Sequence, residues 1–278
     1  MIDNMYIDNM ILSALKEDMP LGDITTDNLI SADSLSRARL IAKEDGIIAG
    51  LDVAERVFKL LDNNTIFKRN YNDGDSVSFG DIIAEIEGNT RAILKAERTS
   101  LNLLQRLSGI ATKTRQFCER INDLKAAIVD TRKTTPGLRF LEKYAVRAGG
   151  GQNHRFCLSD GVLIKDNHIK AAGGIKKAVE MARANVPHTI KIEVETETIE
   201  QVKEALEAKA DIIMLDNMGL EMMKEAVRLI NNRAIVEASG NVSLDTVFDI
   251  ASTGVDIISV GSLTHSVRAM DISLKFID

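Results

Sequence analysis

The second half of the chain alternates between short apolar segments and amphipathic segments, and this alternation limits the folds open to it. From residue 124 onward we predict six strands, at 126–131, 161–165, 189–195, 211–216, 234–239 and 256–261. Segments with helical periodicity separate most of them, at 175–185, 198–209, 220–231 and 243–252. Strands that alternate with helices indicate βα units and a parallel sheet. The pattern therefore favours a parallel α/β barrel, complete or open.

A doubly wound parallel sheet is the alternative architecture. Such sheets commonly bind nucleotides through a glycine-rich loop that follows a strand. No GxGxxG sequence follows a predicted strand here, and the chain contains no GxxxxGK[ST] sequence. The two common phosphate-binding loops are therefore missing, which leaves the barrel as the favoured reading.

The first part of the chain mixes helical and strand patterns. Apolar residues at helical spacing predict helices at 3–18 and 51–62. Residues 37–50 are expected to form paired short strands around a turn at 44–46. Gly74 and Gly80 are expected in turns between further short strands.

A long helical pattern follows over residues 90–120. Ser108 and Gly109 lie in its middle, and we expect them to break or kink the helix. We place the boundary between two domains near these residues.

Composition and charge argue against several classes of protein. The formal net charge of −6 disfavours nucleic-acid binding, and the apolar runs are too short to span a bilayer. The first ten residues include two acids and lack the basic region of a signal peptide. We therefore expect a cytoplasmic protein with no nucleic-acid or membrane partner. Cys118 and Cys157 are expected to be reduced thiols, because neither belongs to a CxxC pair.

Positive charge is concentrated in one stretch of this acidic chain. Between Arg132 and Lys170 there are eight basic residues and three acidic ones. Three consecutive glycines, Gly149 to Gly151, lie within the stretch and could let backbone amides approach an anion. Such a cationic cluster suits a small anionic ligand, and the alternative is a solvated basic face.

Polar residues follow most of the predicted strands, at the end where barrel enzymes carry their active sites. Lys191, Glu193 and Glu195 alternate with two apolar residues, so all three should share the inner face of their strand. Charges buried there need partners or a ligand. We expect a ligand site, with an internal ion-pair network that includes Lys165 as the alternative.

Residue chemistry suggests how such a site would be divided. Arg132 and Arg155 could each grip a carboxylate with two hydrogen bonds, whereas Lys133 and Lys165 would act as point charges toward phosphate. Glu195 and Asp216 are oxygen ligands suited to Mg²⁺ on a pyrophosphate, directly or through water. Backbone amides after two late strands would bind phosphate, at Ser239, Gly240, Asn241, Gly261 and Ser262.

Nine stretches resemble those of one enzyme family and occur in the family's order. They are GDITT at 22–26, AERTSLNLLQRLSGIAT at 96–112, DTRKTTPGLR at 130–139, KYAVRAGGGQNHR at 143–155, LIKDNHI at 163–169, KIEVE at 191–195, LDN at 215–217, EASGNV at 237–242 and ISVGSLTHS at 258–266. Together they cover almost the whole chain. On these stretches the sequence closely resembles the quinolinate phosphoribosyltransferases, also called carboxylating nicotinate-nucleotide pyrophosphorylases.

The resemblance implies a two-domain fold. An N-terminal α/β sandwich would span residues 1–111 and an incomplete α/β barrel residues 112–267. The closing segment, 268–278, would return to the first domain. The resemblance also implies a homodimer or higher homo-oligomer whose active site is shared between subunits.

The resemblance also assigns site residues by position. Arg98 matches an arginine supplied by the partner subunit, and Arg132, His154, Arg155 and Lys165 match residues around quinolinate. The positions that bind phosphoribosyl pyrophosphate and Mg²⁺ match Lys133, Glu195, Asp216, Ser239 and Gly261, and His265 matches a position near the phosphate. We expect catalysis to depend on Lys133, Lys165, Glu195 and Asp216. Asn241 departs from the family pattern, since many relatives have a third small residue there (SGG), and we expect a modest effect.

The implied reaction transfers phosphoribose from phosphoribosyl pyrophosphate to quinolinate with decarboxylation, in NAD biosynthesis. The products would be nicotinate mononucleotide, pyrophosphate and CO₂. Two alternatives are a nicotinate phosphoribosyltransferase, whose substrate has one carboxylate, and a non-enzymatic barrel that binds a sugar phosphate. The arginine set at positions 98, 132 and 155 favours a dicarboxylate substrate.

Overall fold

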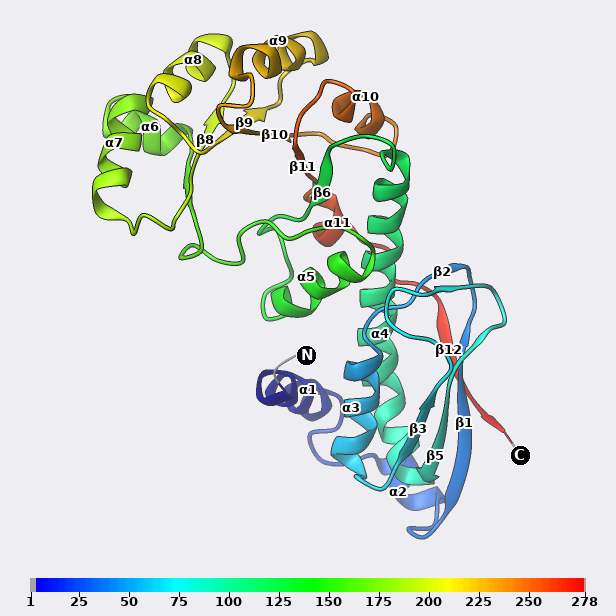
Figure 1. Cartoon of the computed structure of the whole chain (residues 1–278). Coiled ribbons are helices and arrows are strands. Elements are labelled where there is room, and N and C mark those ends of the chain that lie inside the picture. The colour runs from blue at the N-terminus through cyan, green and yellow to red at the C-terminus, as the bar shows by residue number, and fades with distance from the viewer. Residues whose placement is uncertain (1–3, 278) are drawn as a thin grey trace. The chain divides into compact units, whose positions relative to one another are not determined.

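The computed structural model describes residues 4–277, which form two compact units (Figure 1). Residues 4–113, 136–150 and 266–277 make up the first unit, and residues 114–135 and 151–265 make up the second. The predicted first helix is confirmed as α1 (Asn4–Asp18), with residue 3 outside the described residues. The domain limits predicted at residues 111 and 267 stay a prediction.

The first unit is built on an antiparallel sheet with the strand order β12-β1-β5-β3. Its strands are β1 (Leu35–Ala42), β2 (Gly46–Ile47), β3 (Ile66–Arg69), β4 (Ser76–Val77), β5 (Ile82–Asn89) and β12 (Ile272–Ile277), with β2 and β4 forming a separate pair. Its helices are α1, α2 (Ile24–Leu29), α3 (Leu51–Leu61), α5 (Arg139–Ala148) and most of α4 (Thr90–Arg120). The predicted helix at 51–62 is thereby confirmed, and Gly74 and Gly80 lie in turns with positive φ.

The hairpin predicted within residues 37–50 is wrong. β1 pairs with β5 and with β12, whereas β2 pairs with β4. Arg37 lies opposite Ile277 and Ala42 opposite Ile272, so the last strand of the chain takes the place of the expected neighbour. A pairing over this sequence distance leaves no local signal in the chain.

Of the break or kink predicted at Ser108 and Gly109, the break is wrong, because α4 is continuous from Thr90 to Arg120, and the kink stays a prediction. Both residues serve packing inside the first unit. Ser108 Oγ accepts a hydrogen bond from the Ala49 amide at 3.1 Å. A Cβ atom on Gly109 would lie 2.1 Å from the Arg268 carbonyl oxygen, so glycine permits a close backbone approach.

The predicted cationic cluster is divided between the two units. Residues 139–148 form α5, which belongs to the first unit, and this helix buries Glu142 and Lys143. Arg106 Nη2 lies 2.6 Å from the buried Glu142 carboxylate, within the same unit. Part of the cluster is therefore structural, and only its ends belong to the second unit.

The second unit contains the predicted parallel α/β fold (Figure 1). Its strand order is β6-β11-β10-β9-β8-β7, and β6 and β7 form the two edges, so the barrel is open. The strands are β6 (Ala127–Val129), β7 (Val162–Ile164), β8 (Ile192–Thr196), β9 (Ile212–Asp216), β10 (Ile235–Ser239) and β11 (Ile257–Ser259). All six lie within the ranges predicted from the sequence or one residue beyond them.

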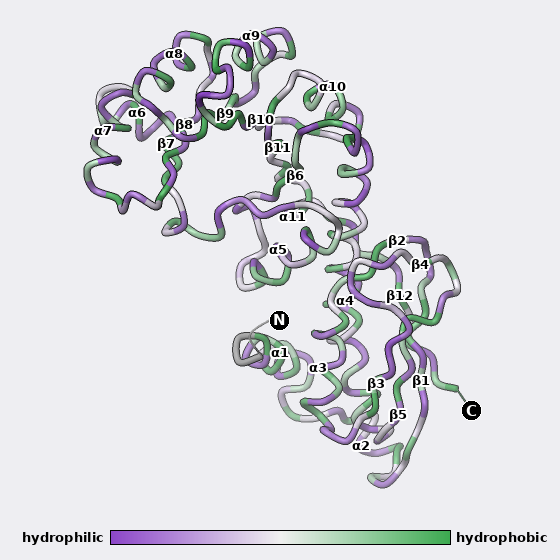
Figure 2. Tube along the Cα trace, viewed as in Figure 1, coloured by the Kyte–Doolittle hydropathy of each residue, from purple (hydrophilic) through white to green (hydrophobic). Residues whose placement is uncertain are grey.

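Helices follow the strands of this sheet, and α7 to α10 pack against it. They are α6 (Asp166–Ala172), α7 (Ile175–Asn185), α8 (Ile199–Glu207), α9 (Leu220–Ile230), α10 (Val247–Ala251) and α11 (Ser262–His265). Hydrophilic and hydrophobic residues alternate along the outer helices, as the amphipathic pattern requires (Figure 2). Buried side chains such as Val202, Met223 and Ile230 pack inward. No helix within residues 4–277 is both long and apolar enough to cross a membrane.

Candidate active site

A cavity of about 930 Å³ lies in the second unit, at the carboxyl ends of the parallel strands. This volume suits a small-molecule ligand. Glu195 on β8, Met214 on β9 and Glu237 on β10 are in register across three neighbouring strands, and all three line the cavity. The sheet therefore brings acidic side chains to the same opening as the basic residues that follow β6 and β7.

Most of the predicted site residues line this one cavity. They are Arg132, Lys133, His154, Arg155, Lys165, Glu195, Asp216, Ser239, Gly240, Asn241, Gly261, Ser262 and His265. Arg98 is the exception, because it is an exposed residue of α4 in the first unit. The three consecutive glycines at 149–151 do not line the cavity either.

Arg132 and Arg155 bring two positive charges to the cavity. Burial and the charge of Arg132 both lower the pKa of Arg155. Arg155 Nη1 also donates a hydrogen bond to the Gly161 carbonyl oxygen at 2.9 Å. An anion bound between the two guanidinium groups would reduce the repulsion between them.

Lys165 and Glu195 form an ion pair at the cavity, with Lys165 Nζ 2.7 Å from Glu195 Oε2. An ion pair with Lys165 was the alternative to the expected ligand site, and the structure places this pair at the cavity itself. His168 Nδ1 accepts a hydrogen bond from the Lys165 backbone amide at 3.0 Å. His168 thus caps the start of α6 and fixes the backbone of Lys165.

Gly261 leaves room for two basic side chains. A Cβ atom at this position would lie 3.3 Å from Lys133 Cδ and 3.3 Å from His265 Cδ2. Thr264 Oγ1 donates a hydrogen bond to the Lys133 carbonyl oxygen at 2.8 Å. Thr264 of α11 therefore holds the backbone of Lys133, and Gly261 leaves space for its side chain.

A chain of hydrogen bonds joins Asp216 to the loop after β10. Asn217 Nδ2 donates to Asp216 Oδ2 at 2.9 Å, and Asn241 Nδ2 donates to Asn217 Oδ1 at 3.2 Å. The backbone amide of Asn217 also donates a hydrogen bond to the Ser239 carbonyl oxygen at 2.9 Å. Asn241 has a φ of 52°, the left-handed conformation that asparagine tolerates better than most residues.

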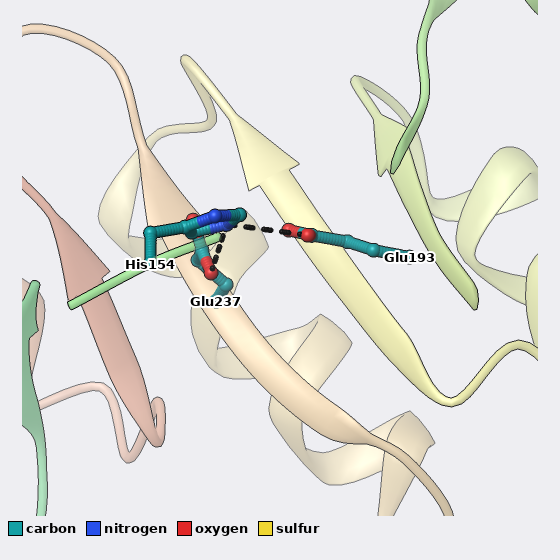
Figure 3. A group of neighbouring side chains, drawn as sticks. All are labelled: His154, Glu193 and Glu237. Atoms are coloured by element: carbon teal, nitrogen blue, oxygen red, sulfur yellow. Dashed lines mark ion pairs between the residues drawn. The ribbon is translucent and has the colours of Figure 1, made fainter. Parts of the chain in front are cut away.

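His154 lies between the buried carboxylates of Glu193 and Glu237 (Figure 3), and His154 and Glu237 also line the cavity. Its Nε2 atom is 3.2 Å from Glu193 Oε2 and 3.4 Å from Glu237 Oε2. Burial opposes a charge on the ring, but hydrogen bonds and the charges of both carboxylates outweigh it and raise the pKa of His154 to about 10. Burial also raises the pKa of Glu193. Because the three groups interact strongly, the retained proton belongs to the cluster rather than to one residue.

Two sets of side chains are candidates for holding a metal ion. His154, Glu193 and Glu237 offer ligand atoms within 4.8 Å of one another. However, the Arg155 amide donates to His154 Nδ1 at 2.7 Å, which places the ring hydrogen on Nε2 and leaves no lone pair there for a metal. Glu195 and Asp216 instead offer carboxylate oxygens that line the cavity itself.

Glu237 and Asn217 line the cavity but were not predicted as site residues. Glu237 is an isolated acid within the apolar strand β10, and this was the available signal. Asn217 directly follows Asp216 at the end of β9, and this position was the available signal. Its contacts with Asp216 and Asn241 depend on two loops meeting, which the sequence does not reveal.

The chain matches family models along most of its length. The model of the quinolinate phosphoribosyl transferase N-terminal domain matches residues 23–108, and that of the C-terminal domain matches residues 110–275. This chain belongs to the quinolinate phosphoribosyltransferase family.

Curated members of this family resemble the chain closely. A probable carboxylating nicotinate-nucleotide pyrophosphorylase of Synechocystis sp. is 47% identical over 276 residues, which cover 98% of this chain and 93% of that protein. One from Bacillus subtilis is 45% identical over 273 residues, covering 98% of this chain and 94% of that protein.

Solved structures of the family share the fold. NadC from Streptococcus pyogenes matches with a TM-score of 0.96 at 43% identity, covering 100% of this chain and 99% of that one. The nicotinate-nucleotide pyrophosphorylase of Francisella tularensis matches with a TM-score of 0.96 at 42% identity, covering 100% and 98%. Human nicotinic acid phosphoribosyltransferase is 10% identical with a TM-score of 0.65, covering 100% and 74%, and it shares the fold alone.

Proposed function

We propose that this protein transfers the phosphoribosyl group of phosphoribosyl pyrophosphate to quinolinate and releases CO₂. The products are nicotinate mononucleotide, pyrophosphate and CO₂. Membership of the quinolinate phosphoribosyltransferase family, through both of its domains, carries the proposal. A cavity that combines separate cations with carboxylates supports it, because both substrates are multiply anionic.

Quinolinate is proposed to bind beside Arg132 and Arg155. Each guanidinium can hold a carboxylate through paired hydrogen bonds. The two arginines are both positive and repel each other. A dicarboxylate is therefore favoured over a monocarboxylate, since each of its carboxylates neutralises one guanidinium. Lys165 adds a further positive charge. Arg98 is proposed to reach the site from the partner subunit, which makes the protein a homodimer or higher homo-oligomer with a shared active site.

Phosphoribosyl pyrophosphate is proposed to bind along the other side of the cavity. Lys133 offers positive charge to its phosphates, and His265 offers a ring nitrogen that can form a hydrogen bond. Backbone amides at Ser239, Gly240, Asn241, Gly261 and Ser262 offer further hydrogen-bond donors. Glu195 and Asp216 fit Mg²⁺, because carboxylate oxygens are the ligands this ion prefers and two of them line the cavity. Mg²⁺ would neutralise charge on the departing pyrophosphate.

The chemistry has two steps that balance without a covalent enzyme intermediate. First, the bond between ribose C1 and the pyrophosphate oxygen breaks, and the quinolinate nitrogen forms a bond to C1. The ring nitrogen thereby becomes cationic. The bond from ring carbon 2 to its carboxylate then breaks, CO₂ leaves, and the electron pair stays on carbon 2 until that carbon takes up a proton. We propose Lys133 or Lys165 as the donor of this proton.

Electrostatic preorganisation is proposed to supply most of the rate enhancement. Glu195 and Asp216 would stabilise the positive charge that develops on the ribose, while the cations hold the anionic groups that flank it. Residues named as catalytic, which are Lys133, Lys165, Glu195 and Asp216, therefore act mainly by position and charge. We place the reaction in the cytoplasm, which cell fractionation would test.

The deciding experiment is an assay of the purified protein with quinolinate, phosphoribosyl pyrophosphate and Mg²⁺. Pyrophosphate and CO₂ are measured together, with nicotinate as a parallel substrate and a chelator in a matched sample. Quinolinate-dependent release of both products, abolished by the chelator and restored by Mg²⁺, is expected. Turnover with nicotinate alone would make the protein a nicotinate phosphoribosyltransferase. Binding without turnover, by folded protein, would make it a sugar-phosphate-binding barrel.

A further inference from the structure

Both ring nitrogens of His154 have partners within the protein. The Arg155 backbone amide donates to Nδ1 at 2.7 Å, while Nε2 faces Glu193 and Glu237 at 3.2 and 3.4 Å. A nitrogen that accepts a hydrogen bond carries no hydrogen, so the ring hydrogen lies on Nε2 and points at the carboxylates. In this arrangement no ring N–H is left to bind a carboxylate of a substrate.

The backbone of His154 is fixed as firmly as its ring. Its amide donates to Asp130 Oδ1 at 2.9 Å, and Asp130 is fully buried. The other oxygen of Asp130 accepts a hydrogen bond from the Asn153 side chain. Asp130 therefore fixes the backbone at His154, and the two glutamates fix the imidazole ring (Figure 3).

The two glutamates occupy an unfavourable environment. Their exposed fractions are 4% for Glu193 and 1% for Glu237, and in each the Oε1 atom has no hydrogen-bond partner among the described residues. A buried carboxylate oxygen without a partner costs free energy, and apolar residues would pack such a position more stably. A stability role alone therefore does not account for them.

We propose that Glu193 and Glu237 are positioning residues, which hold the His154 ring so that Arg155 presents its guanidinium to quinolinate. His154 is the link, because its Nδ1 atom accepts the Arg155 amide while its Nε2 is held by the glutamates. Arg155 lines the cavity, whereas Glu193 does not. The inference rests on the proposed function, since it concerns how the same site recognises quinolinate.

Glu193 offers the sharper test, because it contacts His154 and does not line the cavity. Its charge also acts directly on Arg155, and the glutamine variant separates that effect from the hydrogen bond. Glu193→Met removes both the acceptor oxygen and the charge at similar volume, and Glu193→Gln keeps an acceptor oxygen and removes the charge. We expect Glu193→Met to raise the KM for quinolinate about tenfold or more, because a misplaced guanidinium loses most of its paired contact. Glu193→Gln should stay close to the unmodified protein, and neither variant should change the KM for phosphoribosyl pyrophosphate.

Stability and structure provide readouts besides turnover. Urea unfolding should show that both variants remain folded, because Glu237 still faces His154 Nε2 at 3.4 Å. A crystal structure of the Glu193→Met protein should show the 2.7 Å contact between His154 Nδ1 and the Arg155 amide lengthened or lost. Glu221→Gln is the matched control, because Glu221 is exposed on α9 and pairs only with Lys224 among the contacts found for it.

The outcomes separate this inference from the proposed function. If the unmodified protein shows no quinolinate turnover, the proposed function fails. If it is active and folded Glu193→Met keeps the same KM for quinolinate, the positioning role is wrong. Equal damage in the Gln and Met variants would also overturn it, since the acceptor oxygen would then be irrelevant. An unmoved His154 ring in the Met structure would do the same.

Discussion

A Cβ atom on Gly240 would lie 2.1 Å from Asn217 Oδ1, so the side chain of Asn217 fills the space that any larger residue at position 240 would need. Gly240 also has a φ of 95°, which other residues rarely adopt. The loop after β10 can therefore approach the loop after β9 only with glycine at this position. Through that approach Asn217 reaches both Asp216 and Asn241.

Gly240→Ala should displace Asn217 and with it the Asp216 carboxylate. We expect the KM for phosphoribosyl pyrophosphate to rise about tenfold or more, and the protein to lose roughly 1–3 kcal/mol of stability. Steady-state kinetics and urea unfolding measure the two effects. Gly219→Ala is the matched control, because Gly219 has an ordinary φ of −73° and a Cβ there would meet nothing within 4 Å. Equal behaviour of the two variants would contradict the prediction.

Asn241 allows the strain of its backbone to be separated from the bond made by its side chain. Asn241→Gly removes the hydrogen bond to Asn217 and keeps the left-handed conformation without strain. Asn241→Ala removes the same bond and adds about 1 kcal/mol of strain. We expect the stability order unmodified, then Gly, then Ala, with only a small change in kinetics for Gly. Urea unfolding of the three proteins measures this order. An alanine variant as stable as the glycine variant would show that the backbone at position 241 is not strained.

Much of the fold was predictable because its signals are local. Each βα unit of the second half carries its own apolar strand and amphipathic helix, and each can be located without knowing its neighbours. The failures were non-local. The partner of β1 is β12, at the far end of the chain, and Gly109 is tolerated in α4 because the backbone of Arg268 packs against it. α5 was missed because its basic residues were interpreted as part of a ligand site.

The site was predictable to the same extent and for the same reason. Residues that directly follow parallel strands meet at one edge of the sheet, so Lys165, Glu195, Asp216 and Ser239 could be grouped from the sequence. Glu237 was not predicted as a site residue, although it lies in a strand as Glu193 does. Its significance depends on His154, which comes from a different loop and reaches both carboxylates only in the folded chain.

Arg132→Ala should impair the use of quinolinate more than the use of phosphoribosyl pyrophosphate. A carboxylate in a desolvated site would lose its charge-assisted partner, at a cost of roughly 2–5 kcal/mol. Comparing kcat/KM with each substrate varied in turn measures the difference. Arg228→Ala is a suitable control, because Arg228 lies on α9 of the same unit and does not line the cavity. Unchanged quinolinate kinetics in Arg132→Ala would remove this residue from the site.

A mixture of two inactive variants tests whether subunits share the site. Arg98→Ala and Arg155→Ala are each expected to be nearly inactive. If Arg98 acts in the partner's cavity, a hybrid dimer has one site with both arginines and one with neither. Mixing after partial unfolding should then restore up to about a quarter of the activity, because half the dimers are hybrids with one intact site each. Subunit exchange is checked with two affinity tags, and exchange without recovery would argue against a shared site.

The His154 cluster predicts how stability depends on pH. Glu193 and Glu237 raise the pKa of His154 from 6.5 to about 10, so the folded cluster retains a proton that the unfolded chain releases at lower pH. Because Nδ1 accepts the Arg155 amide, this proton lies between Nε2 and the two glutamates. The resulting stability is fully present below pH 6.5 and is lost as pH rises toward 10. We expect the free energy of unfolding to fall by on the order of 1–3 kcal/mol between pH 7 and 9, as urea titrations would measure. The Glu193→Gln/Glu237→Gln protein should lose most of this slope, because without the carboxylates burial alone acts on the ring and lowers its pKa. The same slope in both proteins would mean that the proton is held elsewhere.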